Sequence, residues 1–134
     1  MSNKNCEDLE IYQIAYDLAL KMHNLISDLP KSEQYGEGNQ IKRSSKSIAA
    51  NIVEGFGRKR YKKDFIKFLT YARASCDETI VHLNFIYDTG NIEKNIYEDL
   101  KNNFNDLSRK IYKFIAAVEY CHNKSLNNQL SIKH

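Results

Sequence analysis

Hydrophobic residues recur along this chain at alternating steps of four and three residues, in four separate stretches. The steps run through Ile11, Ala15, Leu18, Met22, Leu25 and Leu29; through Ile41, Ser45, Ile48 and Ile52; through Phe65, Leu69, Ala72, Cys76, Thr79, Leu83 and Ile86; and through Leu100, Phe104, Leu107, Ile111, Phe114, Val118 and Cys121. This spacing is typical of the seam between helices that pack at a shallow angle. No stretch shows the two-residue alternation of a β-strand.

The four stretches predict helices over about residues 8–29, 40–56, 61–89 and 94–122. Pro30 ends the first helix, residues 31–39 form a loop, and Gly57 suits the left-handed conformation just past the end of the second helix. The polar residues 123–134 predict a flexible tail. Short connections between such helices predict one all-α domain, residues 1–134, folded as an up-down-up-down, left-handed four-helix bundle.

A second apolar stripe lies beside the seam of the first helix. It consists of Leu9, Tyr12, Tyr16, Ala19 and Ile26. One apolar face is enough for a helix that packs on a single side, so two stripes indicate burial against more than one neighbour. The pattern therefore favours an oligomer of this chain.

Composition narrows the class of protein. Hydrophobic residues make up 42% of the chain and charged residues 28%, as in soluble globular proteins. Cys6, Cys76 and Cys121 contain no CxxC pair, and we interpret Cys76 and Cys121 as small core residues. The N-terminal sequence MSNKNCEDLE lacks the apolar segment of a secretory signal, and no apolar run approaches the roughly 20 residues that span a membrane. We therefore expect a protein of the reducing cytoplasm with no membrane partner.

The charges are distributed unevenly, although the net charge is only +3. Between residues 42 and 73 ten cations face only Glu54 and Asp64, which gives this window a net charge of +8 and leaves −5 for the rest of the chain. The ten cations are Lys42, Arg43, Lys46, Arg58, Lys59, Arg60, Lys62, Lys63, Lys67 and Arg73. Several of them crowd the start of the third helix, where the helix dipole prefers anions. An external anion would offset this unfavourable placement.

Three interpretations of these cations remain open. They can form a solvated surface, bind the phosphate backbone of RNA or DNA, or meet an acidic protein partner. Tyr61 and Tyr71 interleave with the charges, as in nucleic-acid-binding surfaces. No motif for reading base sequence is present, so we expect binding that depends on the backbone rather than on sequence.

A line of polar residues follows one face of the second helix. It runs through Arg43, Ser47, Asn51, Glu54 and Arg58. Ser47, Asn51 and Glu54 either bond to a neighbouring helix and fix the bend, or contact a ligand.

Catalytic and metal-binding motifs are absent from the sequence, and we expect a non-enzymatic protein without cofactors. Glu119 and His122 have the spacing of a helical metal pair, but no second pair with two further inward glutamates accompanies them. A nuclease site built from Arg73 and His82 on one helix is the remaining enzymatic alternative, and their nine-residue separation spans about 13.5 Å.

Residues 40–75 carry a specific motif, QIKRSSKSIAANIVEGFGRKRYKKDFIKFLTYARAS. It closely resembles the core of the bacterial four-helix bundle family of proteins encoded in intervening sequences of 23S ribosomal RNA genes. Ala49 and Val53 depart from that family's usual Pro and Ala, and Ala74-Ser75 from its Gly-Ser. The resemblance spans about residues 8–120 and implies a ring-shaped homopentamer. It also implies similarity to the accessory protein of diversity-generating retroelements, whose partners are nucleic acid and a reverse transcriptase.

Overall fold

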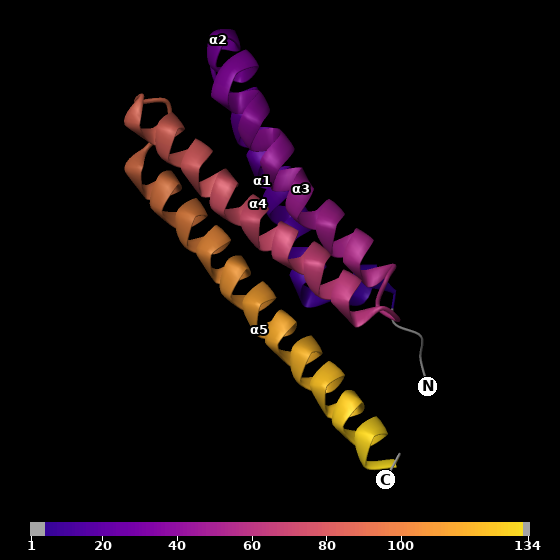
Figure 1. Cartoon of the computed structure of the whole chain (residues 1–134). Coiled ribbons are helices and arrows are strands. Elements are labelled where there is room, and N and C mark those ends of the chain that lie inside the picture. The colour runs from indigo at the N-terminus through magenta and orange to yellow at the C-terminus, as the bar shows by residue number, and fades with distance from the viewer. Residues whose placement is uncertain (1–4, 133–134) are drawn as a thin grey trace.

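Four long helices dominate the structure, a computed structural model that describes residues 5–132. They are α1 (Glu10–Ser27), α3 (Asn39–Phe56), α4 (Lys62–Asp88) and α5 (Lys94–Ile132), and the short elements are η1 (Cys6–Asp8), α2 (Lys31–Glu33) and η2 (Gln34–Gly38). The chain reverses direction between successive long helices (Figure 1). Residues 5–132 contain no strand. The predicted all-α fold with four long helices is confirmed.

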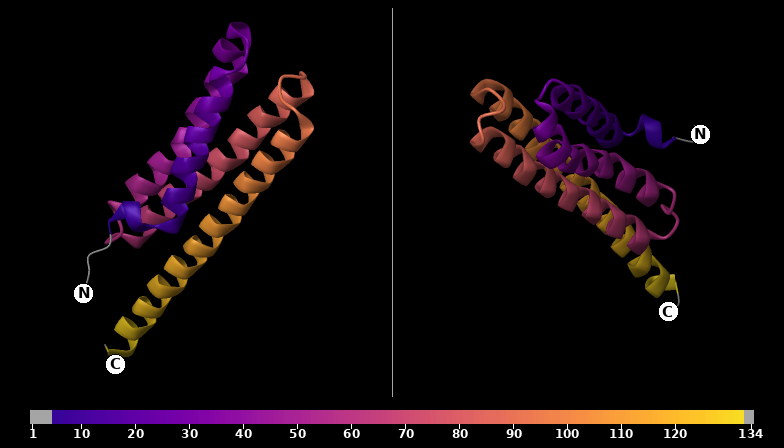
Figure 2. Two further views of the ribbon diagram at one scale, coloured as in Figure 1. Left: turned by 180° about the vertical axis from the view of Figure 1, so that it is seen from behind. Right: turned by 90° about the horizontal axis from the view of Figure 1, so that it is seen from above.

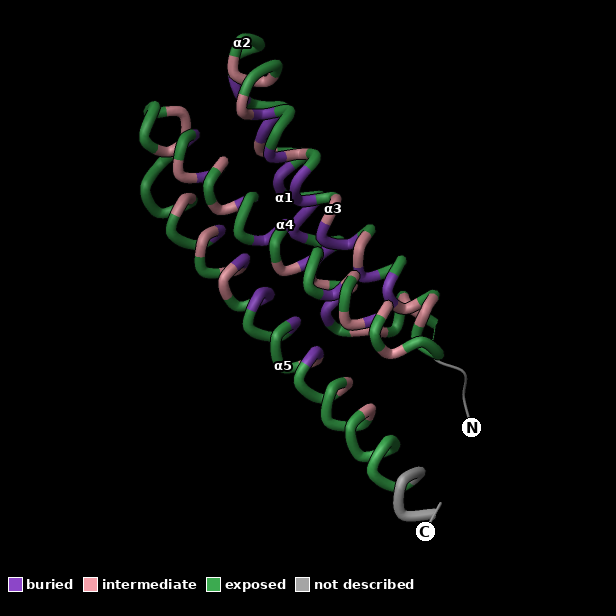
Figure 3. The backbone as a smooth tube through the Cα atoms, viewed as in Figure 1, coloured by how far each residue is buried: buried purple, intermediate pink, exposed green. Residues whose placement is uncertain are grey.

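The helices pack in chain order around a common core. α1 packs on α3, α3 on α4 and α4 on α5, while α1 also contacts α5, so the four helices close into a bundle (Figure 2). Most seam residues predicted from the spacing are buried, except toward the end of α5, and the buried positions follow one side of each helix (Figure 3). The largest side chains with essentially no exposed surface include Met22, Ile26, Ile48, Leu69, Leu83, Phe104 and Ile111. Burial of this apolar surface is the main stabilising term of the fold.

α3 and α4 approach each other closely because small residues line their contact. A Cβ added at Gly55 would lie 3.1 Å from the Phe68 Cβ and 3.2 Å from the Phe65 ring, so only glycine fits without displacing α4. In the buried part of the same contact the Thr79 hydroxyl donates to the Ser75 carbonyl at 2.7 Å, and its oxygen lies 2.9 Å from Ser44 Oγ. Hydrogen bonding thereby offsets the cost of burying these hydroxyls.

The connection between α1 and α3 differs from the predicted loop over residues 31–39. It continues as the helical turn α2 and the π-helical turn η2, with a kink at Gly36 (φ −90°, ψ −113°). Gly38 is buried, and a Cβ there would lie 2.7 Å from both the Glu33 carbonyl oxygen and Ile26 Cγ2. Glu37 Oε2 lies 2.7 Å from His82 Nδ1, which joins η2 to α4. The packing of Gly38 and the contact between Glu37 and His82 hold this kinked segment against α1 and α4.

Three further predictions are wrong. Gly57 has helical rather than left-handed angles (φ −62°, ψ −19°), and Gly90, with φ of 79°, takes the left-handed conformation after α4 instead. Cys121 is exposed, because α5 has by then passed the end of the core, whereas Cys76 is buried as expected. The predicted helix end at residue 122 lies too early, since α5 continues to Ile132 (Figure 1). Residues 133 and 134 of the predicted tail lie outside the described residues.

Candidate nucleic-acid interface

The turn between α3 and α4, residues 58–63, gathers five of the ten cations and is called the cationic turn below. Its backbone is closed by hydrogen bonds from the Arg58 amide to the Gly55 carbonyl and from the Tyr61 amide to the Arg58 carbonyl. Tyr61 precedes α4 in an extended conformation, and no side chain caps the helix N-terminus. Lys62 and Lys63 occupy the first helical turn. The partial positive charge of the helix end and these side chains therefore add up.

The ten predicted cations do not form one patch. Lys42 and Arg43 lie near the start of α3, and the 14 steps along the helix from Lys42 to Phe56 span about 21 Å. Lys46 faces α1. Arg58, Lys59, Arg60, Lys62 and Lys63 belong to the cationic turn, with Lys67 one helical turn further along α4. Arg73 faces α5, where its Nε donates to Ser108 Oγ at 3.3 Å and its guanidinium lies 4.9 Å from the centre of the Tyr112 ring.

Two cations of the cationic turn are held by neighbouring side chains. Arg58 Nη1 donates to Glu54 Oε2 at 2.6 Å and to the Glu54 carbonyl at 3.0 Å, and its guanidinium lies 4.6 Å from the centre of the Phe68 ring. Lys59 Nζ lies 4.2 Å from the centre of the Phe56 ring. Among residues 5–128, whose side chains the structure describes, Arg60, Lys62 and Lys63 form no ion pair. These three cations are free to bind an anion.

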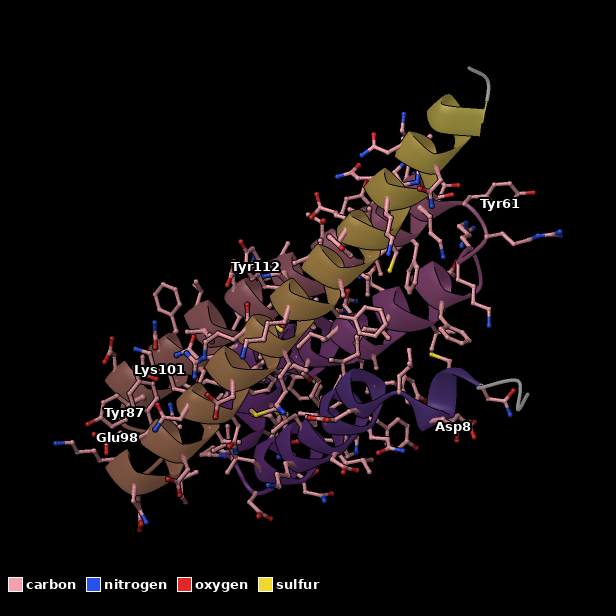
Figure 4. All side chains as sticks on the ribbon, turned by 90° about the horizontal axis from the view of Figure 1, so that it is seen from below. Asp8, Tyr61, Tyr87, Glu98, Lys101 and Tyr112 are labelled. Carbon is pink, nitrogen blue, oxygen red and sulfur yellow. The ribbon has the colours of Figure 1, made fainter. Side chains whose placement is uncertain are left out.

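A shallow hollow of about 420 Å³ lies beside the cationic turn. It is lined by Arg60, Tyr61, Lys62, Lys63, Asp64 and His122. Figure 4 shows Tyr61 pointing away from the bundle at this end. His122 comes from α5, and its spacing from Glu119 in the sequence gave no sign that it lies beside the cationic turn. Its place is set by the antiparallel packing of α4 and α5, which no local sequence signal reports.

The polar line on α3 has mainly structural contacts. The Ser47 hydroxyl lies 3.0 Å from Ser75 Oγ and so joins α3 to α4. The Asn51 amide donates to the Ser47 carbonyl at 2.9 Å and to Ser47 Oγ at 3.1 Å, within the same helix. Glu54 orients Arg58. These bonds favour the interpretation that the line fixes the helix contact and the bend.

A second hollow, the apolar groove, lies between α1 and α3 and has a volume of about 450 Å³. Its lining residues are Tyr12, Tyr16, Ala19, Leu20, His23, Lys46, Ala49, Ala50 and Val53. Tyr16 and Leu20 are each 49% exposed, and Val53 is 44% exposed. Part of the second apolar stripe predicted for α1 is thus left on the surface. Desolvation, with a smaller contribution from Glu7, raises the pKa of the Tyr12 hydroxyl, so this tyrosine stays neutral.

The candidate catalytic groups do not come together. His82 bonds to Glu37, while Arg73 bonds to Ser108 on the other side of α4. Burial, followed by the nearby Asp77 charge, raises the pKa of the Cys76 thiol to about 12, so this thiol does not ionise at neutral pH. In the described part of the chain no cluster of three His, Cys, Asp or Glu side chains could hold a metal ion, and no helix is long and apolar enough to cross a membrane.

Comparison with known proteins identifies a family and similar solved structures. Residues 7–113 match the family model described as 23S rRNA-intervening sequence protein, which confirms the resemblance drawn from residues 40–75. A crystal structure from Bacteroides thetaiotaomicron, described as a protein with unknown function from the S23 ribosomal protein family, is similar with a TM-score of 0.73 and 26% sequence identity. The similarity covers 79% of this chain and 95% of the other. A search of curated proteins found no match.

Proposed function

The chain belongs to the family of 23S rRNA-intervening sequence proteins, and we propose that it binds the phosphate backbone of RNA or DNA through the cationic turn. The observation that carries this proposal is the group of three unpaired cations, Arg60, Lys62 and Lys63, at the uncapped N-terminus of α4. Cations at this helix end repel its dipole and one another. A bound phosphate relieves both repulsions at once, and its counterions are released to solvent.

The test is the affinity of a labelled 20-nucleotide RNA or DNA, measured by fluorescence anisotropy at several salt concentrations. We expect binding that weakens steeply with salt, because each phosphate neutralised contributes to the slope. Replacing Arg60, Lys62 and Lys63 together by Glu should lower the affinity at least about 100-fold at 50 mM salt. The matched control replaces the exposed Lys31, Lys94 and Lys113 by Glu. It changes the net charge by the same amount, at positions outside the cationic turn. Equal losses in both variants, or no binding by the wild type, would contradict the proposal.

We propose no catalytic role. The separate contacts of Arg73 and His82 support this, because neither side chain is free to complete a site with the other. Nuclease activity that survives purification and disappears in Arg73→Ala or His82→Ala would overturn it. We also propose a cytoplasmic location, which the three widely spaced cysteines without a paired-cysteine motif support.

A second proposal is self-association through the apolar groove, with the ring-shaped homopentamer as the specific expectation. The groove exposes large apolar side chains, and a second copy of this chain is the occupant always present at matching concentration. Its rims also differ in charge, since Lys46 lines it while Glu7 and Asp17 line the adjoining hollow beside Tyr12 and Tyr16. Rims of opposite charge favour pairing with another copy of the chain. Light scattering that finds a monomer at micromolar concentration would contradict this proposal.

The alternative to nucleic-acid binding is a scaffold or accessory subunit that docks a partner protein such as a reverse transcriptase. The same cationic turn would then meet an acidic protein surface. Co-purification of one stoichiometric protein without nucleic acid would favour this alternative over the first proposal.

A further inference from the structure

Next to the cationic turn four side chains form a continuous cluster, called the aromatic cluster below: Arg58, Lys67, Phe68 and Tyr71. The rings of Phe68 and Tyr71 meet edge to face with centres 5.7 Å apart. Arg58 lies 4.6 Å and Lys67 Nζ 5.2 Å from the centre of the Phe68 ring. Phe68 is half-buried under these neighbours, whereas Tyr71 is 47% exposed. The edge-to-face contact with Phe68 thus leaves about half of Tyr71 accessible to a ligand.

Glu54 changes what Arg58 can contribute. Its carboxylate lies 2.6 Å from Arg58 Nη1 and cancels most of the guanidinium charge. The same bond, together with that to the Glu54 carbonyl, holds the guanidinium beside the Phe68 ring. Arg58 is therefore poorly suited to neutralise a phosphate. A guanidinium held in this way still offers a flat surface, and flat cationic and aromatic surfaces stack on nucleic-acid bases.

On these grounds we infer that the ligand of the cationic turn is single-stranded nucleic acid, and that one unpaired base stacks on Tyr71 and Arg58 while Arg60, Lys62 and Lys63 bind the adjoining phosphates. This inference rests on the proposed function. In a duplex the base faces are covered by neighbouring base pairs, so only a single strand can use an aromatic surface. Arg58 belongs to both the cationic turn and the aromatic cluster, and Lys67 of the cluster lies one helical turn past Lys63 along α4, so the two contacts adjoin.

The competing explanation is that Tyr71 belongs to a protein contact. Ala74, Val81 and Phe85 continue from Tyr71 along the exposed side of α4 at helical spacing, and Val81 and Phe85 are about half exposed. This explanation predicts that replacing Tyr71 changes the mass of the protein assembly in solution. Base stacking instead predicts a change in the preference between single and double strands.

The experiment compares a 20-nucleotide single strand, its duplex and an abasic single strand of equal length by fluorescence anisotropy at fixed salt, with RNA and DNA arms. We expect the wild type to bind the base-containing strand about tenfold more tightly than the other two ligands. Tyr71→Leu should remove that preference without changing duplex binding, and Tyr71→Phe should keep it. Tyr35→Leu is the matched control, because Tyr35 is 76% exposed on η2 at the other end of the bundle.

Each outcome separates the two proposals. Equal affinity of the wild type for all three ligands overturns base stacking and leaves backbone binding intact. Binding to none of them overturns both. A Tyr71→Leu protein that loses duplex binding or changes mass shows that Tyr71 has a structural or protein-contact role. The comparison of the base-containing strand with the abasic strand uses only the wild-type protein. The inference therefore remains testable even if Tyr71→Leu fails to fold.

Discussion

α3 presents two surfaces that lie on neighbouring sides of the same helix. Toward α1 it contributes Lys46, Ala49 and Val53 to the apolar groove, and toward α4 it contributes the polar line that ends at Arg58. The first surface leaves apolar side chains exposed without polar partners. On the second surface the polar side chains form hydrogen bonds, and Arg58 and Lys67 lie over the nearby Phe68 ring. Side chains three or four residues apart share a face, so one helix can carry an exposed apolar face beside a hydrogen-bonded polar face.

The largest expected effect is on the apolar groove. Replacing Leu20 and Val53 together by Glu would force charge into any contact there, and we expect the dissociation constant of the proposed oligomer to rise at least about 100-fold. Analytical ultracentrifugation measures it. The control replaces Val81 and Phe85 on α4 by Glu, at similar exposure. If the control variant dissociates and the groove variant does not, the chains associate through the Val81 and Phe85 side of α4 and not through the apolar groove.

The contact between α3 and α4 should tolerate no side chain at Gly55. Gly55→Val would push against the Phe65 and Phe68 side chains, and we expect the free energy of unfolding to fall by about 2–3 kcal/mol. Urea denaturation followed by circular dichroism measures this. Gly57→Ala is the control, because Gly57 has helical angles and only ordinary contacts, so it should be neutral or slightly stabilising. A loss at Gly57 comparable to that at Gly55 would contradict the observed turn.

At the far end of α4, Glu37 and His82 hold η2 in place. Glu37→Ala should lower the free energy of unfolding by about 1 kcal/mol, because the partly buried His82 loses its hydrogen-bond partner. Glu78→Ala provides the comparison, since its carboxylate lies 3.9 Å from His82 Nε2 and its side chain is more exposed. We expect that change to stay within about 0.5 kcal/mol. Equal effects of the two substitutions would show that η2 is not fixed by this bond.

The smallest effect concerns Glu54. Glu54→Gln removes the charge that neutralises Arg58, so affinity for nucleic acid at low salt should rise about two- to threefold, with a steeper salt dependence. Glu98→Gln removes one charge near the opposite end of the bundle and serves as control. Weaker binding by Glu54→Gln would mean that the orientation of Arg58 matters more than its free charge.

The sequence predicted the helices because their periodicity is a local property that each segment carries. Ile48, Leu69 and Leu107 stand at the expected steps and are all buried. The contacts it did not predict join distant positions: Glu37 with His82 is 45 residues apart, and His122 reaches the cationic turn through the packing of α5 on α4. The ten cations were identified correctly as a surplus of charge. Their division into paired and unpaired groups depends on side-chain partners such as Glu54 and Ser108, which only three-dimensional packing reveals.

The last turns of α5 extend beyond the other helices, and residues 123–128 are all exposed (Figures 1 and 3). A helical segment without packing is only marginally stable in water, so its backbone amides should exchange with deuterium within seconds. Amides near Phe104 and Ile111 should exchange only when the whole bundle unfolds. Because of this contrast, deuterium exchange at the end of α5 can detect binding to this helix. Slower deuterium uptake at residues 123–128 would report that another molecule has packed against this helix.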